Sequence, residues 1–139
     1  MKKYAESAVC SPRKRRGGMK SLTEINSDIA ECAKHRQLAA TIGRIVNKFA
    51  PALGVTVHEW KIQEMKMYWA SVNTREGKIT FNLKLLDMPP AFIKATVIHE
   101  LVHFLTDGHD AKFHELMDRH APGWRKLHDQ FAEEMTQYS

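Results

Sequence analysis

Hydrophobic residues recur at helical spacing in the first third of the chain, beginning near residue 21. Ser21 and Glu24 have the spacing of a helix N-terminal capping box. The apolar residues that follow at intervals typical of one helix face are Leu22, Ile25, Ile29, Cys32, Leu38, Ile42, Ile45, Val46 and Phe49. Pro51 and Gly54 end this pattern. It predicts one helix, or two consecutive helices, after Ser21.

From Val55 onward the apolar residues alternate with polar ones, as they do in half-buried strands. The alternation runs over residues 55–60, resumes over 65–73 and appears again over 79–83. Residues 74–77 read as a hairpin turn that ends in a glycine. We predict a small three-stranded, mostly antiparallel sheet whose strands follow one another as a meander.

Helical spacing returns after the prolines at 89 and 90, which are suited to the first turn of a helix. This helix should run through Leu105 to Gly108, and a short helix should span 111–120. After Pro122, the residues Trp124, Leu127, Phe131 and Met135 trace the inner face of a last helix. The pattern as a whole predicts an α+β fold with N-terminal and C-terminal helices around the sheet.

Two histidines and a glutamate in the helix predicted to follow the sheet have the spacing of a metal site. His99 and His103 are four residues apart in the run His99-Glu100-Leu101-Val102-His103. Residues at this interval share a helix face, so both imidazoles can reach one metal ion. Glu100 is offset by about 100 degrees, but its longer side chain can reach water in the metal's open position. The spacing indicates two metal ligands and a base within one turn.

A third protein ligand would complete a catalytic zinc site with one open position. Its candidates follow closely in the sequence and are Asp107, His109, Asp110, His114, Glu115 and His120. We favour His109, because Gly108 before it could adopt the left-handed conformation that turns the chain back toward the metal. Asp110 would then cap the next helix, on which Phe113 packs inward and His114 points about 100 degrees away.

The formal net charge of +5 belongs to one end of the chain. Of the 21 basic and 16 acidic residues, six basic residues and Glu6 lie in the first 18, which leaves fifteen of each sign in residues 19–139. Residues 11–18 combine turn formers and like charges without apolar periodicity. We predict a disordered basic tail over residues 1–20 and one domain over 21–139, with nucleic acid bound, if at all, only through the tail.

The apolar runs and the cysteines of the sequence indicate the cellular compartment of the protein. No apolar run approaches the roughly 18–20 residues of a membrane span, and no apolar signal-peptide core follows Lys2 and Lys3. The two cysteines, Cys10 and Cys32, lack a metal-ligand spacing, and we expect two free thiols. We expect a soluble cytoplasmic protein.

Three further segments carry a family resemblance. They are Trp69-Ala70-Ser71, Gly77-Lys78-Ile79-Thr80-Phe81-Asn82 and Pro89-Pro90, and all precede the run from His99 to His103. With these segments the chain resembles the YgjP-like metallopeptidases over roughly residues 60–137. Residues 108–113 also resemble an element of the SprT-like and WLM metalloproteases. The chain departs from the YgjP-like pattern at Ala70 and Val72, which replace glycine and cysteine, and at His114, which replaces a tryptophan.

The resemblance implies a zincin-like fold with a helix over a small sheet. It also implies one zinc ion bound by His99, His103 and His109, with Glu100 as the catalytic base. We therefore expect a zinc metalloendopeptidase, a hydrolase whose peptide or protein substrate pairs with a sheet edge. Tyr68 and His114 are candidate cleft or oxyanion-stabilising residues.

Two alternatives stay open at this point. One is a metal-dependent hydrolase of a non-peptide substrate, because an activated water does not reveal its target. The other is a DNA-associated protease of the SprT or WLM type, anchored by the basic tail.

Overall fold

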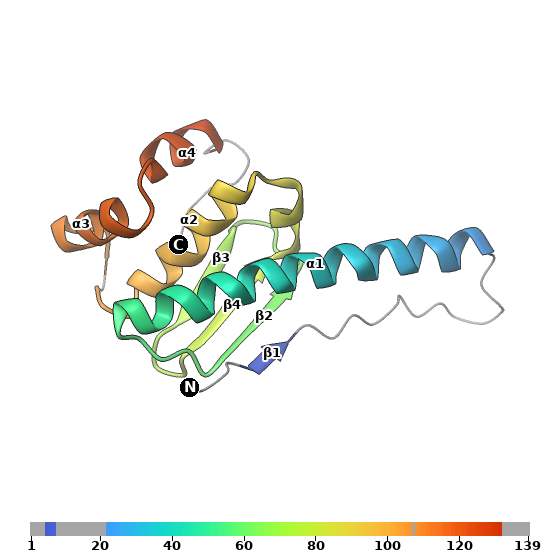
Figure 1. Cartoon of the computed structure of the whole chain (residues 1–139), viewed down its shortest axis with the longest axis horizontal. Helices are drawn as coiled ribbons and strands as arrows, with labels where there is room; N and C mark the ends of the chain where they lie inside the picture. Colours follow the sequence, from blue (N-terminus) through green and yellow to red (C-terminus); the bar gives the residue numbers. More distant parts are fainter. Residues whose placement is uncertain (1–4, 8–21, 107, 132–139) are drawn as a thin grey trace.

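The computed structural model describes residues 5–7, 22–106 and 108–131, with the backbone alone in residues 5–7 and 22–31. Helices α1 (Leu22–Leu53) and α2 (Pro90–Val102) lie against one face of a mixed sheet, as Figure 1 shows. Helices α3 (Ala111–His120) and α4 (Trp124–Phe131) pack on α2 on the side away from α1. The α+β class predicted from the sequence is confirmed.

The sheet has four strands, in the order β1 (Ala5–Ser7), β2 (Glu59–Gln63), β4 (Lys78–Asn82) and β3 (Ala70–Asn73). The β1–β2 and β2–β4 pairs are parallel, and only β3–β4 is antiparallel. The predicted meander and the mostly antiparallel pairing are therefore wrong. The hairpin at residues 74–77 is confirmed. The loop after β2 leads the chain to β3 at the edge of the sheet, and the hairpin then returns it to β4, which lies between β2 and β3.

Asn82, at the end of β4, holds that crossing loop. Its side chain is fully buried, and its amide nitrogen donates to the carbonyl oxygens of Met65 and Tyr68 at 2.9 and 2.8 Å. Its side-chain oxygen accepts from the backbone N–H of Lys84 at 3.0 Å, which caps the short 3-10 helix η1 (Leu83–Asp87). One buried amide thus fixes both the end of the central strand and the loop beside it.

Helix α1 is one continuous helix of 32 residues, which settles whether the N-terminal pattern makes one helix or two. Pro51 lies in its last turn, and Gly54 follows with φ of 73°, a left-handed conformation that glycine adopts without strain. The helix extends past the sheet at its N-terminal end (Figure 1).

Helix α2 is the centre of the core. Every residue from Phe92 to Val102 except Lys94 is buried, so this helix is enclosed on all sides rather than amphipathic. Trp60, Ile79 and Phe81 of the sheet are at most 1% exposed on the side that faces the helices. A polar side chain placed on α2 is therefore held in a rigid, apolar setting.

Two expectations about the N-terminal part need correction. Ala5–Ser7 pair with Glu59–Lys61, so this part of the predicted disordered tail is a strand. The rest of residues 1–20 lies outside the described residues, and the division into tail and domain stays a prediction. Cys32 is disulfide-bonded, so the expected free thiol is wrong at this position, and Cys10 lies outside the described residues.

Among the described residues, no helix combines the length and the apolar composition that crossing a membrane requires.

Candidate metal centre

The first two histidines of the site are placed by α2. Pro89 and Pro90 begin this helix, and His99 and His103 lie near its C-terminal end, His99 within the last turn and His103 as the C-cap residue. Their rings are 4.7 Å apart between centroids, at an interplanar angle of 69°. The four-residue spacing therefore brings the two imidazoles together, as predicted.

The chain then reverses so that His109 returns to the same place, but not in the predicted way. Helix α2 ends at Val102 rather than near Gly108, and tight turns follow, with Leu105 N–H donating to Val102 O at 2.8 Å. Gly108 has no positive φ, so the expected left-handed cap is wrong. The buried hydroxyl of Thr106 instead donates to the Gly108 carbonyl at 3.1 Å and secures the residue before His109.

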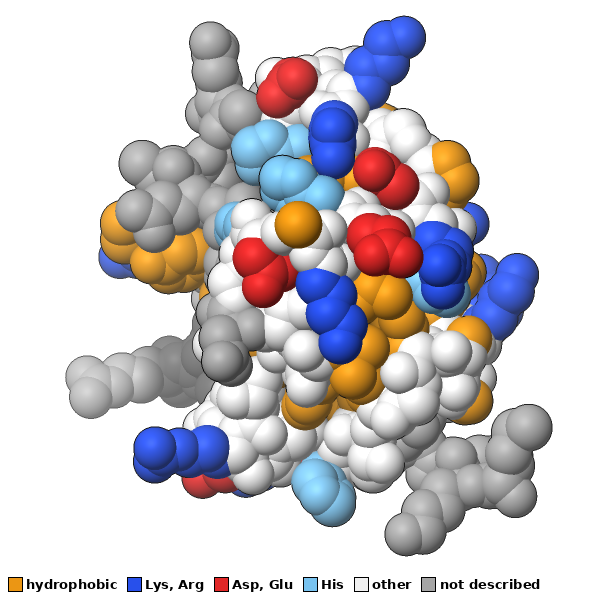
Figure 2. Space-filling model, turned by 90° about the vertical axis from the view of Figure 1, so that its left-hand side faces the viewer, with side chains coloured by type: hydrophobic (Ala, Val, Ile, Leu, Met, Phe, Trp, Pro, Cys, Tyr) orange, Lys and Arg blue, Asp and Glu red, His pale blue; other side chains and the backbone are white. Residues whose placement is uncertain are grey.

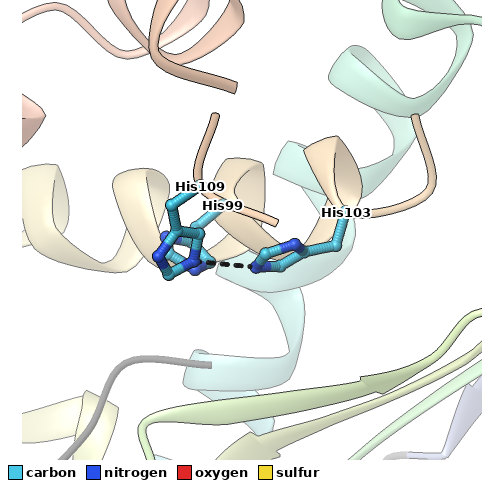
Figure 3. A group of neighbouring side chains, drawn as sticks. All are labelled: His99, His103 and His109. Atoms are coloured by element: carbon cyan, nitrogen blue, oxygen red, sulfur yellow. Dashed lines mark hydrogen bonds between the residues drawn. The ribbon is translucent and has the colours of Figure 1, made fainter. Parts of the chain in front are cut away.

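The three histidines converge on one point, as Figure 3 shows. One ligating nitrogen from each of His99, His103 and His109 lies within 4.8 Å of the others. The ring of His109 is 5.0 Å from that of His99 and 5.1 Å from that of His103 between centroids. These residues form a group that can hold a metal ion.

The spacing of the nitrogens fits a small tetrahedral ion. Two nitrogens bound at about 2.0–2.1 Å to one tetrahedral zinc lie about 3.3–3.4 Å apart. The Nε2 atoms of His103 and His109 are 3.3 Å apart, the contact drawn in Figure 3. An all-imidazole donor set suits zinc, copper, iron or nickel, whereas magnesium and calcium prefer oxygen.

Exposure changes in a graded way across the group. His99 is 2% exposed, His103 is half-buried and His109 is exposed. Figure 2 looks onto the end of the molecule that carries α3 and shows histidine side chains at the surface there, with acidic side chains around them. The group thus extends from the buried core to a histidine that solvent can reach.

Glu100 follows His99 on α2 and is 1% exposed. Glutamate side chains are almost never fully buried unless they are paired. Glu100 is adjacent in the chain to His99, and both side chains lie in the buried interior.

Asp110 and Phe113 define the start of α3 as predicted. Asp110 is the N-cap residue, and its side chain accepts from the Phe113 N–H at 2.9 Å. Phe113 is 1% exposed and packs inward. The predicted bounds of this helix, Ala111–His120, are confirmed.

None of the other described candidates belongs to the group that can hold a metal ion, and Asp107 lies outside the described residues. His114 leans on Trp124, with ring centroids 5.6 Å apart, and His120 packs edge-on against Phe49. Tyr68 is half-buried in the loop that Asn82 holds, and its carbonyl oxygen accepts from Asn82. The cleft or oxyanion role of Tyr68 and His114 stays a prediction.

Two residues of this region were not recognised from the sequence as part of it. Thr106 secures the reversal through its hydroxyl, and the ring of Phe113 touches all three histidines. The inward position of Phe113 was predicted from helical spacing, but the residues it would face depend on the reversal, for which the sequence has no local signal.

A known structure has the same fold. The crystal structure of the metallopeptidase zymogen of Pyrococcus abyssi abylysin superimposes with a TM-score of 0.61 at 20% sequence identity. The match covers 70% of this chain and 97% of that one. No curated protein matches the sequence.

The α+β fold thus brings together three histidines that can hold a metal ion, and the neighbour with this fold is a metallopeptidase zymogen. Residues 11–134 match the family described as YgjP-like, metallopeptidase domain. The chain belongs to this family, and the resemblance seen in its sequence is confirmed.

Proposed function

We propose that this chain is a zinc-dependent endopeptidase in which His99, His103 and His109 hold one zinc ion and Glu100 is the general base. The observation that carries the proposal is the convergence of three imidazole nitrogens within 4.8 Å, together with a buried glutamate that follows His99 in α2. Membership of a metallopeptidase family supports the reaction class.

Bound zinc would supply a Lewis acid and a water whose pKa is lowered to about 7. The protein's own residues do the rest. The Glu100 carboxylate accepts a proton from the attacking water and delivers it to the leaving amine. The enclosed helix α2 fixes the carboxylate relative to the imidazoles, so little reorganisation is needed during the reaction.

The sheet offers a place for an extended substrate. Strand β3 ends the strand order on the side opposite β1, and α2 packs against it. An edge strand has unpaired backbone groups that can bind a peptide by strand addition. We infer that the substrate main chain lies along β3, next to the histidines at the end of α2.

A matched pair of proteins tests the assignment of Glu100. Glu100→Gln keeps the three imidazoles and nearly the same volume but removes the proton acceptor. It should bind zinc with the stoichiometry of the wild type and lose nearly all peptide hydrolysis, at least about a hundredfold. Undiminished hydrolysis by the zinc-loaded variant would refute the role of Glu100.

A substrate panel separates peptide hydrolysis from the alternative reactions. Zinc-loaded protein is incubated with unfolded casein and, separately, with small esters and nucleotides. Cleavage of casein that is abolished by a chelator and restored by zinc supports the proposal. Turnover confined to the esters or nucleotides would show a non-peptide hydrolase instead.

A further inference from the structure

One aromatic ring touches every histidine of the metal centre. The Phe113 ring lies 4.9 Å from His99, 5.3 Å from His103 and 4.6 Å from His109 between centroids. It meets the first edge-on at 75°, the second nearly stacked at 29° and the third tilted at 38°. The Phe113 ring is therefore a common neighbour of all three imidazoles.

The Phe113 ring is itself packed against an aromatic residue of α4. Phe113 is 1% exposed, and Trp124 of α4 meets it edge-on with 5.8 Å between centroids. The indole N–H of Trp124 donates to the Asp118 carboxylate at 2.9 Å, which ties α4 to α3. Phe113 therefore has no room to rotate away when a ligand presses on the imidazoles.

The backbone of Phe113 is fixed as well, and it is fixed next to His109. The Asp110 side chain accepts from the Phe113 N–H at 2.9 Å and begins α3 one residue after His109. The exposed histidine, the helix cap and the aromatic ring thus belong to one segment of five residues, 109–113. Where α3 begins determines where both His109 and the ring lie.

We propose that Phe113 is a positioning residue that presets the three imidazoles for metal binding, with Asp110 holding it in place. His109 lies in an exposed loop and His103 is half-buried, so without the Phe113 ring both imidazoles would sample several rotamers. Ordering them before the metal arrives lowers the entropic cost of binding. The same ring keeps the protein side of the centre apolar and excludes water there.

This inference rests on the proposed function, because it takes the three histidines as the metal ligands. That Phe113 orders the side chains of these histidines is a separate claim. The test measures affinity for Zn2+ and the visible absorption of bound Co2+, whose intensity follows coordination geometry. Neither readout depends on hydrolysis.

The first comparison sets Phe113→Leu against Phe81→Leu in the full chain. Both remove a ring that is at most 1% exposed, but Phe81 packs on Trp60 in the sheet rather than on the histidines. Phe113→Leu should weaken zinc binding by about 10- to 100-fold and alter the Co2+ spectrum. Phe81→Leu should lower the melting temperature and leave both metal readouts unchanged.

The second comparison uses the cap and does not disturb the core. Asp110→Ala removes the hydrogen bond to Phe113, whereas Asp110→Asn keeps a good helix cap. We expect Asp110→Ala to weaken zinc binding by severalfold and Asp110→Asn to restore it. This pair decides the question if Phe113→Leu does not fold.

The outcomes are distinct. The role of Phe113 would be overturned if Phe113→Leu kept the zinc affinity and Co2+ spectrum of the wild type. It would also be overturned if Phe81→Leu lost as much zinc affinity as Phe113→Leu. If Phe113→Leu does not fold, equal zinc affinities of Asp110→Ala and Asp110→Asn would overturn it. A wild-type chain that binds neither ion would instead refute the proposed function itself.

Discussion

Replacing His109 and His114 in turn gives the sharpest test of the ligand assignment. The two residues lie five positions apart, and both were candidates for the third ligand. The structure places His109 with its Nε2 atom 3.3 Å from that of His103, whereas the His114 ring packs on Trp124. His109→Ala should therefore lose tight zinc binding, and His114→Ala should keep it.

The expected size of the effect follows from the number of ligands. Structural zinc sites with four protein ligands bind with about 10–16 kcal/mol, so each ligand contributes about 2.5–4 kcal/mol on average. Because about 1.4 kcal/mol is a factor of ten, His109→Ala should weaken zinc binding roughly a hundredfold to a thousandfold. His109 is exposed but its ring contacts Phe113, so the metal-free protein should lose about 0.5–1.5 kcal/mol of stability.

His114→Ala, in contrast to His109→Ala, should not weaken zinc binding. It removes an aromatic contact with Trp124, which costs about 0.5–1.5 kcal/mol of stability, and leaves the metal centre intact. The assay is a competition titration of zinc against a chelator of known affinity, with thermal unfolding of the metal-free proteins in parallel. A tight-binding His109→Ala protein together with a metal-free His114→Ala protein would refute the assignment.

Three further predictions address the site, the tail and the fold. Zinc content and hydrolysis should fall together below about pH 6, because protons compete with zinc for the imidazole nitrogens; full zinc retention at about pH 4.5 would contradict a three-histidine site. Replacing the four basic residues at 13–16 by glutamine does not alter β1 and should leave hydrolysis unchanged. The slope of log affinity for duplex DNA against log salt concentration should become shallower by up to about 3.6. An unchanged slope would place DNA binding elsewhere. Gly77→Ala should cost about 1–3 kcal/mol, because φ is 68° and the new Cβ would lie 2.5 Å from His58 Cδ2. Gly54→Ala, with φ of 73° but no atom within 4 Å, should cost less, and equal shifts in melting temperature would show that the clash with His58 is unimportant.

Local patterns predicted the parts of this protein that local geometry determines. His99 and His103 share a helix face because of their spacing, and Asp110 caps α3 because a short acidic side chain precedes a helical pattern. The hairpin at residues 74–77 was also recognisable, since its glycine adopts positive φ. Each of these features depends on residues within a few positions of one another.

The features that the sequence did not predict depend on distant partners. Alternation of polar and apolar residues predicts strands but not their neighbours, so the insertion of β4 between β2 and β3 could not be read from it. The reversal before His109 uses the Thr106 hydroxyl rather than the glycine that the usual helix ending would favour. The contact of Phe113 with three histidines follows from that reversal and was equally hidden.

The central claim is that the chain hydrolyses peptide bonds by way of Glu100 beside a metal held by three histidines. It is tested most directly by incubating an unfolded proteome with the zinc-loaded wild type and, in parallel, with zinc-loaded Glu100→Gln, and then sequencing the new peptide N-termini. We predict new termini with the wild type that are absent with the variant and absent when zinc is removed. A wild-type sample without new termini, or the same termini in both samples, would contradict the claim.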